Sequence, residues 1–183
     1  MTKKDAIINA ALELLVKKGV HNTPMSEIAR AAGTGMGTIY NYFSNKDLLI
    51  NQIYVRIKDQ EEALFLEVET DKPIKTQFEN YITVLIQFFL DNPLYFAFLE
   101  QLQASPIITE ENKTKGGRTV EMVRTLLKNG QQGSIIKNME VDDLLMFIGG
   151  AVSAYLRWNT NRPQEKRSSM KNQISLVWDA IKS

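Results

Sequence analysis

The stretch MSEIARAAGTGMGTIYNYFSNKD, residues 25–47, decides how the first part of this chain folds. Its apolar residues recur at helical spacing and predict a short helix that ends at Gly33, where a tight turn needs the backbone freedom of glycine. A second short helix is predicted over residues 36–43, with Ile39 and Phe43 four positions apart on its buried side. Two short helices joined by a glycine turn are therefore expected here.

Helical periodicity continues on both sides of this stretch, and no alternating pattern of a β-strand interrupts it. The fold class is therefore predicted as all-α, with about nine helices. The expected helices cover residues 3–18, 24–32, 36–43, 46–69, 74–90, 93–103, 110–128 and 141–160, followed by a last helix that ends near Ile181. We expect a small N-terminal domain over residues 1–46 and a larger C-terminal domain over residues 47–183.

The composition is that of an ordinary globular protein, with 44% hydrophobic and 23% charged residues. The absence of cysteine excludes disulfides, thiol catalysis and cysteine-containing zinc sites. No apolar stretch reaches the roughly 18 residues of a membrane span, and no signal peptide is evident, so a cytoplasmic location and no membrane partner are expected. The acidic pairs Glu61-Glu62 and Glu110-Glu111 are interpreted as solvated faces.

The outward face of residues 34–42 has the chemistry of a surface that meets DNA. A helix fits the major groove of B-DNA, which is about 12 Å wide, if a second helix braces it. Between Glu27 and Asp47 there is no acidic residue, as a surface that meets phosphates requires. Residues 1–46 carry a net charge of +3, which is compatible with this interpretation. The alternative is a helical hairpin that merely has one polar face.

The segments AIINAALELLVKKGVHNTPMSEIARAAG and GTGMGTIYNYFSNKDLL closely resemble the signature of the TetR-type (TetR/AcrR) transcriptional regulators over residues 6–50. The resemblance implies an all-helical homodimer, usually a repressor, whose N-terminal helix-turn-helix domain binds a double-stranded DNA operator. It also implies that the larger domain binds a small inducer. The positions that match DNA-contacting places of the family are Ser26, Met36, Gly37, Thr38, Tyr40, Asn41, Tyr42 and Lys46.

Within this set, the resemblance implies phosphate contacts for Thr38, Tyr42 and Lys46, and contacts to bases or backbone for Tyr40 and Asn41. One departure concerns Gly35-Met36, where the family usually has Ser-Lys. The chain thereby loses a side-chain cap and a positive charge toward DNA, and Met36 is instead placed to touch a thymine methyl group.

The C-terminal part contains a helix that is apolar on nearly all sides, LLMFIGGAVSAYLRW, residues 144–158. Such a helix is buried on more than one side, which indicates either a subunit interface or the core of one subunit. With the family resemblance, homodimerisation is the favoured interpretation. The expected interface residues are Gly150, Ala154, Ile174 and Trp178.

Residues 78–98 are rich in aromatic side chains, most of which are expected to pack in the core. Because the family implies a cavity in this part, some of them are expected to line a pocket for a small, largely apolar molecule. The candidates are Tyr81, Phe88, Phe89, Phe96, Met122, Met146 and Phe147.

No catalytic residue, cofactor site or metal site is predicted, because the sequence carries no nucleophile motif, no phosphate-binding loop and only one histidine, His21. The sequence therefore predicts a ligand-responsive DNA-binding regulator. A helical adaptor whose head no longer reads DNA, and a helical enzyme, remain as alternatives.

Overall fold

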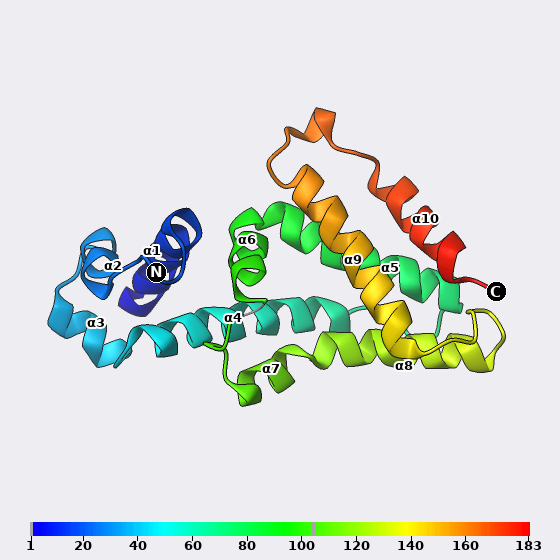
Figure 1. The fold of residues 1–183 in the computed structure, drawn as a ribbon, viewed down its shortest axis with the longest axis horizontal. Coiled ribbons are helices and arrows are strands. Elements are labelled where there is room, and N and C mark those ends of the chain that lie inside the picture. The colour runs from blue at the N-terminus through cyan, green and yellow to red at the C-terminus, as the bar shows by residue number, and fades with distance from the viewer. Residues whose placement is uncertain (1, 104) are drawn as a thin grey trace. The chain divides into compact units, whose positions relative to one another are not determined.

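The computed structural model describes residues 2–103 and 105–183, and the regular elements in these ranges are helices. The helices are α1 (Lys3–Lys18), α2 (Met25–Ala31), α3 (Met36–Tyr42), α4 (Lys46–Leu66), α5 (Ile74–Asp91), α6 (Pro93–Leu102), α7 (Glu110–Gly116), α8 (Arg118–Gln132), α9 (Val141–Asn159) and α10 (Met170–Ile181), with a 3-10 turn at Gln164–Lys166 (Figure 1). The described residues contain no β-strand, only one antiparallel bridge between Ile136 and Lys182. The all-α prediction is confirmed.

The structure differs most clearly from the predicted helices at the division of one helix and at the start of another. The single helix expected over residues 110–128 is divided into α7 and α8, with Gly117 between them. Glycine is a poor helix former, so the Gly116-Gly117 pair accounts for this break. The last helix begins only at Met170, where the Ser169 side chain accepts a hydrogen bond from the Asn172 amide and caps it.

The chain divides into two compact units. The first comprises the residues up to Asp59 and Leu94–Gly116, and the second comprises Gln60–Pro93 and Gly117–Ser183. The helix α4 thus contributes its first part to one unit and its remainder to the other. The proposed functional boundary after residue 46 stays a prediction, since compactness alone does not test it.

In the first unit, α2 packs against both α1 and α3, and α4 begins directly after α3 (Figure 1). The largest fully buried side chains of this unit are Ile7, Leu15, Ile28, Ile39, Leu49, Ile50, Ile53, Ile57 and Phe98. Ile39 is the buried anchor of α3, as its spacing predicts, and Phe43 is buried directly after this helix. The short helix α3 therefore gains its stability from packing, because seven residues are too few to be stable alone.

One buried amide joins α4 to the connection between α6 and α7. The Asn51 side chain donates to the carbonyls of Asp47 and Ile107, at 2.9 and 2.8 Å. Its oxygen accepts from the Thr109 backbone amide at 3.1 Å and from the Asn112 side chain at 2.8 Å. Asn51 is buried, and these four bonds use its full hydrogen-bonding capacity.

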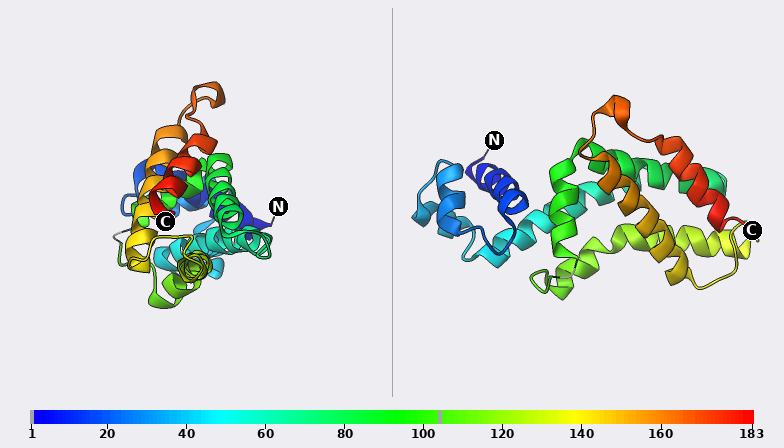
Figure 2. Two further views of the ribbon diagram at one scale, coloured as in Figure 1. Left: turned by 90° about the vertical axis from the view of Figure 1, so that its right-hand side faces the viewer. Right: turned by 45° about the horizontal axis from the view of Figure 1, so that its top comes forward.

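In the second unit, α5 packs against α8, α9 and α10, and α9 also contacts α8 and α10 (Figure 2). The rings of Phe78 and Trp178 join α5 to α10, with 5.5 Å between their centroids. The expected solvated position of Glu61 is wrong, because this residue is buried and accepts a hydrogen bond of 2.7 Å from the Thr119 hydroxyl. Glu61 lies four residues before the buried Phe65 and therefore on the inner stripe of α4.

Candidate nucleic-acid interface

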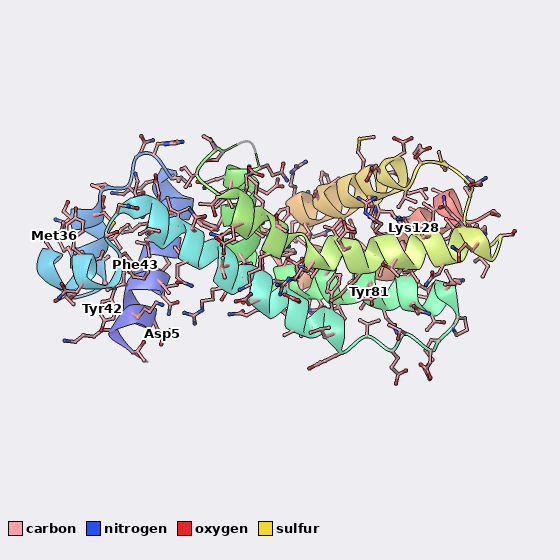
Figure 3. All side chains as sticks on the ribbon, turned by 90° about the horizontal axis from the view of Figure 1, so that it is seen from below. Asp5, Met36, Tyr42, Phe43, Tyr81 and Lys128 are labelled. Carbon is pink, nitrogen blue, oxygen red and sulfur yellow. The ribbon has the colours of Figure 1, made fainter. Side chains whose placement is uncertain are left out.

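The exposed face of α3 carries apolar, aromatic and amide side chains and no charge. Met36, Tyr40 and Tyr42 are 38%, 48% and 45% exposed, and Figure 3 shows Met36 and Tyr42 on the outside of this helix. Gly37 and Asn41 are exposed as well, and Thr38 is half-buried. Since successive turns of a helix bring residues four apart together, Met36, Gly37, Tyr40 and Asn41 form one continuous face.

The turn between α2 and α3 sets the direction of this face. Gly33 has φ of +63°, a left-handed conformation that glycine adopts without strain, as the sequence predicts. The Thr34 amide donates to the Ala29 carbonyl at 2.9 Å and closes the end of α2. Gly35 stands at the N-cap of α3 and offers no side-chain cap. The sequence predicts this loss of a side-chain cap, because glycine stands at position 35 where the family usually has serine.

The start of α1 is held next to α4 by a network around Asp5. The Asp5 carboxylate accepts from the Thr2 hydroxyl at 2.7 Å and from Arg56 of α4 at 2.9 Å, and Thr2 and Asp5 together form a capping box. These hydrogen bonds, first from the Thr2 side chain and then from the Thr2 backbone and Arg56, lower the pKa of Asp5 below its usual value. Lys4 lies over the Phe43 ring, 5.9 Å from its centroid, which places a positive charge near the end of α3.

Lys46 is the first residue of α4, which follows α3 after a short connection. The Lys46 ammonium donates to the His21 carbonyl at 3.2 Å, in the connection between α1 and α2. The Asn45 side chain accepts from the Leu48 amide at 2.8 Å and caps α4. A phosphate bound at Lys46 would therefore also lie close to the first turn of this capped helix.

The acidic residue Glu27 of α2 has a basic partner. Glu27 pairs with Lys18, and the hydrogen bond from Lys18 lowers the pKa of Glu27. Ser26, one residue earlier on α2, is exposed. The carboxylate of Glu27 is thus matched by a lysine rather than presented alone to a phosphate.

The residues predicted to line a ligand pocket do not share one environment. Tyr81, Phe88, Phe89 and Phe96 are buried, and Met122 is half-buried. The rings of Tyr81 and Phe65 lie tilted to each other with 5.1 Å between their centroids, and burial raises the pKa of the Tyr81 hydroxyl. Met146 and Phe147, in contrast, are 73% and 47% exposed on α9. The buried members behave as core residues, and the two on α9 face outward.

The predicted dimer residues also fall into two groups. Gly150 and Ala154 are exposed on α9. Ile174 and Trp178 are buried against the rest of their own unit, where Trp178 contacts Phe78. The exposed residues Met146, Gly150, Ala154 and Trp158 follow one another on α9 at a regular spacing of four residues.

Sequence reasoning did not single out a cleft of about 280 Å³ in the first unit. Its lining residues are Tyr54, Lys58, Leu99, Leu102, Gln103, Ile108 and Lys113. None of the predicted ligand residues belongs to it. The four-residue spacing of Tyr54 and Lys58 on α4 was visible in the sequence, but their meeting with residues of α6 and α7 depends on the tertiary fold.

Neither a metal site nor a spanning helix is found in residues 2–103 and 105–183. No group of three or more His, Asp or Glu side chains there could hold a metal ion. No single helix of these ranges is long and apolar enough to cross a membrane, and α5 and α6 reach that length and hydropathy only when they are counted together.

Comparisons with known proteins agree with this geometry. A family model described as "Bacterial regulatory proteins, tetR family" matches residues 7–53. The "Probable acrEF/envCD operon repressor" of Escherichia coli strain K12 is 25% identical over 168 residues, which cover 86% of this chain and 76% of the relative. The regulator UidR of the same strain is 27% identical over 129 residues, which cover 69% of this chain and 65% of UidR.

Solved structures show the same fold at lower sequence identity. A TetR family transcription regulator from Marinobacter aquaeolei VT8 matches with a TM-score of 0.84 at 20% identity, covering 99% of this chain and 96% of that chain. The ketosteroid transcriptional regulator KstR2 of Mycobacterium tuberculosis matches with a TM-score of 0.81 at 14% identity, covering 100% and 96%.

Proposed function

The chain belongs to the TetR family of bacterial transcriptional regulators, and we propose that it is a ligand-responsive repressor that binds its operator as a homodimer. The relatives and the family are DNA-binding regulators and not enzymes. The observation that carries the proposal is the exposed face of α3, which is free of carboxylates and is fixed by the buried Ile39 and Phe43. Such a helix can enter the major groove with its side chains toward the bases.

The side chains that we propose to contact DNA divide into two roles. In this proposal Thr38 and Tyr42 of α3, together with Lys46 at the start of α4, hold the phosphate backbone. Met36 and Asn41 belong to the central face of α3 and carry the base preference.

Three further residues complete this interface. Tyr40 lies between Met36 and Asn41 on the α3 face, Gly37 permits close approach of the backbone, and Ser26 reaches the groove edge from α2.

The dimer is proposed to form through α9. Gly149 and Gly150 have open space where a side chain would be, so a partner helix can approach their backbone closely. Trp158 is 57% exposed and is covered on one side by Arg162, whose guanidinium lies 3.9 Å from the ring centroid. A two-fold axis across this face would bring the same apolar line of two copies together and would present two α3 helices to two half-sites.

Response to a ligand follows from the position of α4, which begins at the DNA-facing end and continues into the second unit. A small molecule that binds one arrangement of the two heads more tightly than another would shift the dimer toward that arrangement. If that arrangement does not match the half-site spacing of about 34–36 Å, the operator is released.

A gel-shift experiment with DNA fragments from upstream of its own gene, at several salt concentrations, tests DNA binding. We expect a discrete retarded complex and a steep loss of affinity with salt. Sedimentation of Ala154→Glu tests the dimer, because a buried, unpaired carboxylate on the two-fold face should give monomers. An intact dimer of this variant would reject α9 as the interface, and the absence of any retarded fragment would favour a helical adaptor.

A further inference from the structure

The cleft between α4, α6 and α7 lies wholly within the first unit, in the same compact body as the DNA-binding helices. Its volume of about 280 Å³ is near the lower end of small-molecule sites in proteins. Leu99 and the buried Leu102 and Ile108 provide an apolar floor. The cleft can therefore receive an apolar group of modest size.

The polar part of the lining has one sign of charge. Two lysines, Lys58 of α4 and Lys113 of α7, line the cleft together with Tyr54 and Gln103, and its lining contains no carboxylate. Lys113 and Lys58 come from different helices, so the fold itself brings the two lysine side chains to one cleft. An anion is the ligand that this arrangement complements.

Two carboxylates near the opening, Glu110 and Glu100, have hydrogen-bond donors within the cleft lining. Glu110 accepts a hydrogen bond of 2.7 Å from Lys113, but its side chain is 87% exposed. Glu100 is engaged by Gln103 at 2.7 Å. An exposed ion pair contributes little to stability, so a ligand carboxylate can replace Glu110 at Lys113 at small cost.

We propose that this cleft binds a small amphipathic anion, a monocarboxylate with a short alkyl or aryl tail. The tail covers Leu99, Leu102 and Ile108, and the carboxylate is held by Lys58 and Lys113. Tyr54 lines the same cleft.

The location also gives such a ligand a route to the DNA-binding surface, and this part of the inference rests on the proposed function. Tyr54 and Lys58 follow Lys46 on α4 by eight and twelve residues, or about 12 and 18 Å along the helix. Tyr54 also packs so closely on Gly116, the last residue of α7, that a Cβ there would overlap its ring. A ligand beside Tyr54 therefore acts on both α4 and the end of α7.

Calorimetric titration of the full chain with octanoate, 1-octanol and octylammonium tests the proposal. We expect saturable binding of octanoate and at least tenfold weaker binding of the other two probes, which share its tail and lack its charge. Lys58→Ala and Lys113→Ala should each weaken octanoate binding about tenfold, as expected for loss of one charge-assisted hydrogen bond. Lys128→Ala, which removes an exposed lysine of α8, is the matched control and should bind octanoate unchanged.

Lys113→Glu provides a second test that does not depend on loss of binding, because it should favour octylammonium over octanoate. Equal binding of octanoate and 1-octanol, no saturable binding of octanoate, or unchanged affinity in both lysine-to-alanine variants would overturn the proposal. A gel shift without octanoate separates the proposed anion site from the proposed function as a DNA-binding repressor. Loss of operator binding there would reject the proposed function, whereas the calorimetric result on free protein would stand.

Discussion

Replacement of Asn51 by alanine should destabilise the protein strongly for a single polar side chain. Its amide makes four hydrogen bonds of 2.8–3.1 Å, three of them to the segment of residues 107–112. Alanine would leave the Ile107 carbonyl and the Thr109 amide without these partners. Each unpaired buried group costs about 1–3 kcal/mol, and the better helix propensity of alanine returns about 0.6 kcal/mol. We expect a net loss of about 2–3 kcal/mol in the free energy of unfolding.

Urea denaturation followed by circular dichroism measures this loss. With a typical slope of about 2 kcal/mol per molar urea, the midpoint should fall by about 1–1.5 M. A change in the slope itself would indicate that the two compact units no longer unfold together.

Two matched variants test the assignment to the backbone partners. Asn112→Ala removes only one of the bonds to Asn51 and leaves both backbone groups paired, so its effect should stay below about 1 kcal/mol. Asn51→Asp keeps the acceptor for Thr109 and loses both donated bonds, so it should be destabilised as well. A urea midpoint of Asn51→Ala within about 0.3 M of the wild type would refute this prediction. Water would then form hydrogen bonds to the Ile107 carbonyl and the Thr109 amide that are as favourable as those of Asn51.

Three further predictions concern the proposed DNA-binding part of the chain, α1 to α3 and the start of α4. Lys46→Ala should weaken binding to all DNA sequences alike and reduce the slope of affinity against salt concentration by about 1. Asn41→Ala should instead change the preferred sequence in a selection from random DNA. The opposite pattern would reverse the roles of Lys46 and Asn41. If Met36 contacts a thymine methyl group, replacing that thymine by uracil should weaken binding about fourfold, and Met36→Ala should abolish the difference in a gel shift. Asp5→Asn should lower the urea midpoint at pH 7. Because the pKa of Asp5 is depressed in the folded protein, the stability that its carboxylate contributes is complete above its ordinary pKa and is lost as the pH falls through the folded value. An equal fall in the urea midpoint at pH 7 and at about pH 3 would contradict this account.

Local sequence was sufficient for the helices and the head. Helical spacing placed Ile39 and Phe43 on the buried side of α3, and Gly33 was expected where the structure has positive φ. These features depend on interactions within a few residues, such as the i to i+4 spacing and the freedom of glycine, which the sequence displays directly. The apolar character of the C-terminal helices was predicted for the same reason, whereas the break at Gly116-Gly117 and the start of the last helix at Met170 were not.

Only the tertiary structure decided which faces of the body helices are left open. By pattern alone, Ile174, Trp178, Met146 and Phe147 are equivalent apolar residues, yet the first two are buried against their own unit and the last two are exposed. The hydrogen bond from the Thr119 hydroxyl to the buried Glu61 likewise depends on packing between residues 58 positions apart. Burial of a residue depends on which distant helix covers it, and periodicity within one helix does not contain that information.

The stretch from Met25 to Asp47 shows the same division. Its own residues determined that it forms two helices, a glycine turn and an uncharged outer face on α3. Tertiary contacts decided the rest, since the hydrogen bond from Lys46 to His21 and the stacking of Lys4 on Phe43 join residues 25 and 39 positions apart. Such contacts form only when packing brings distant segments together, so no local pattern could reveal them.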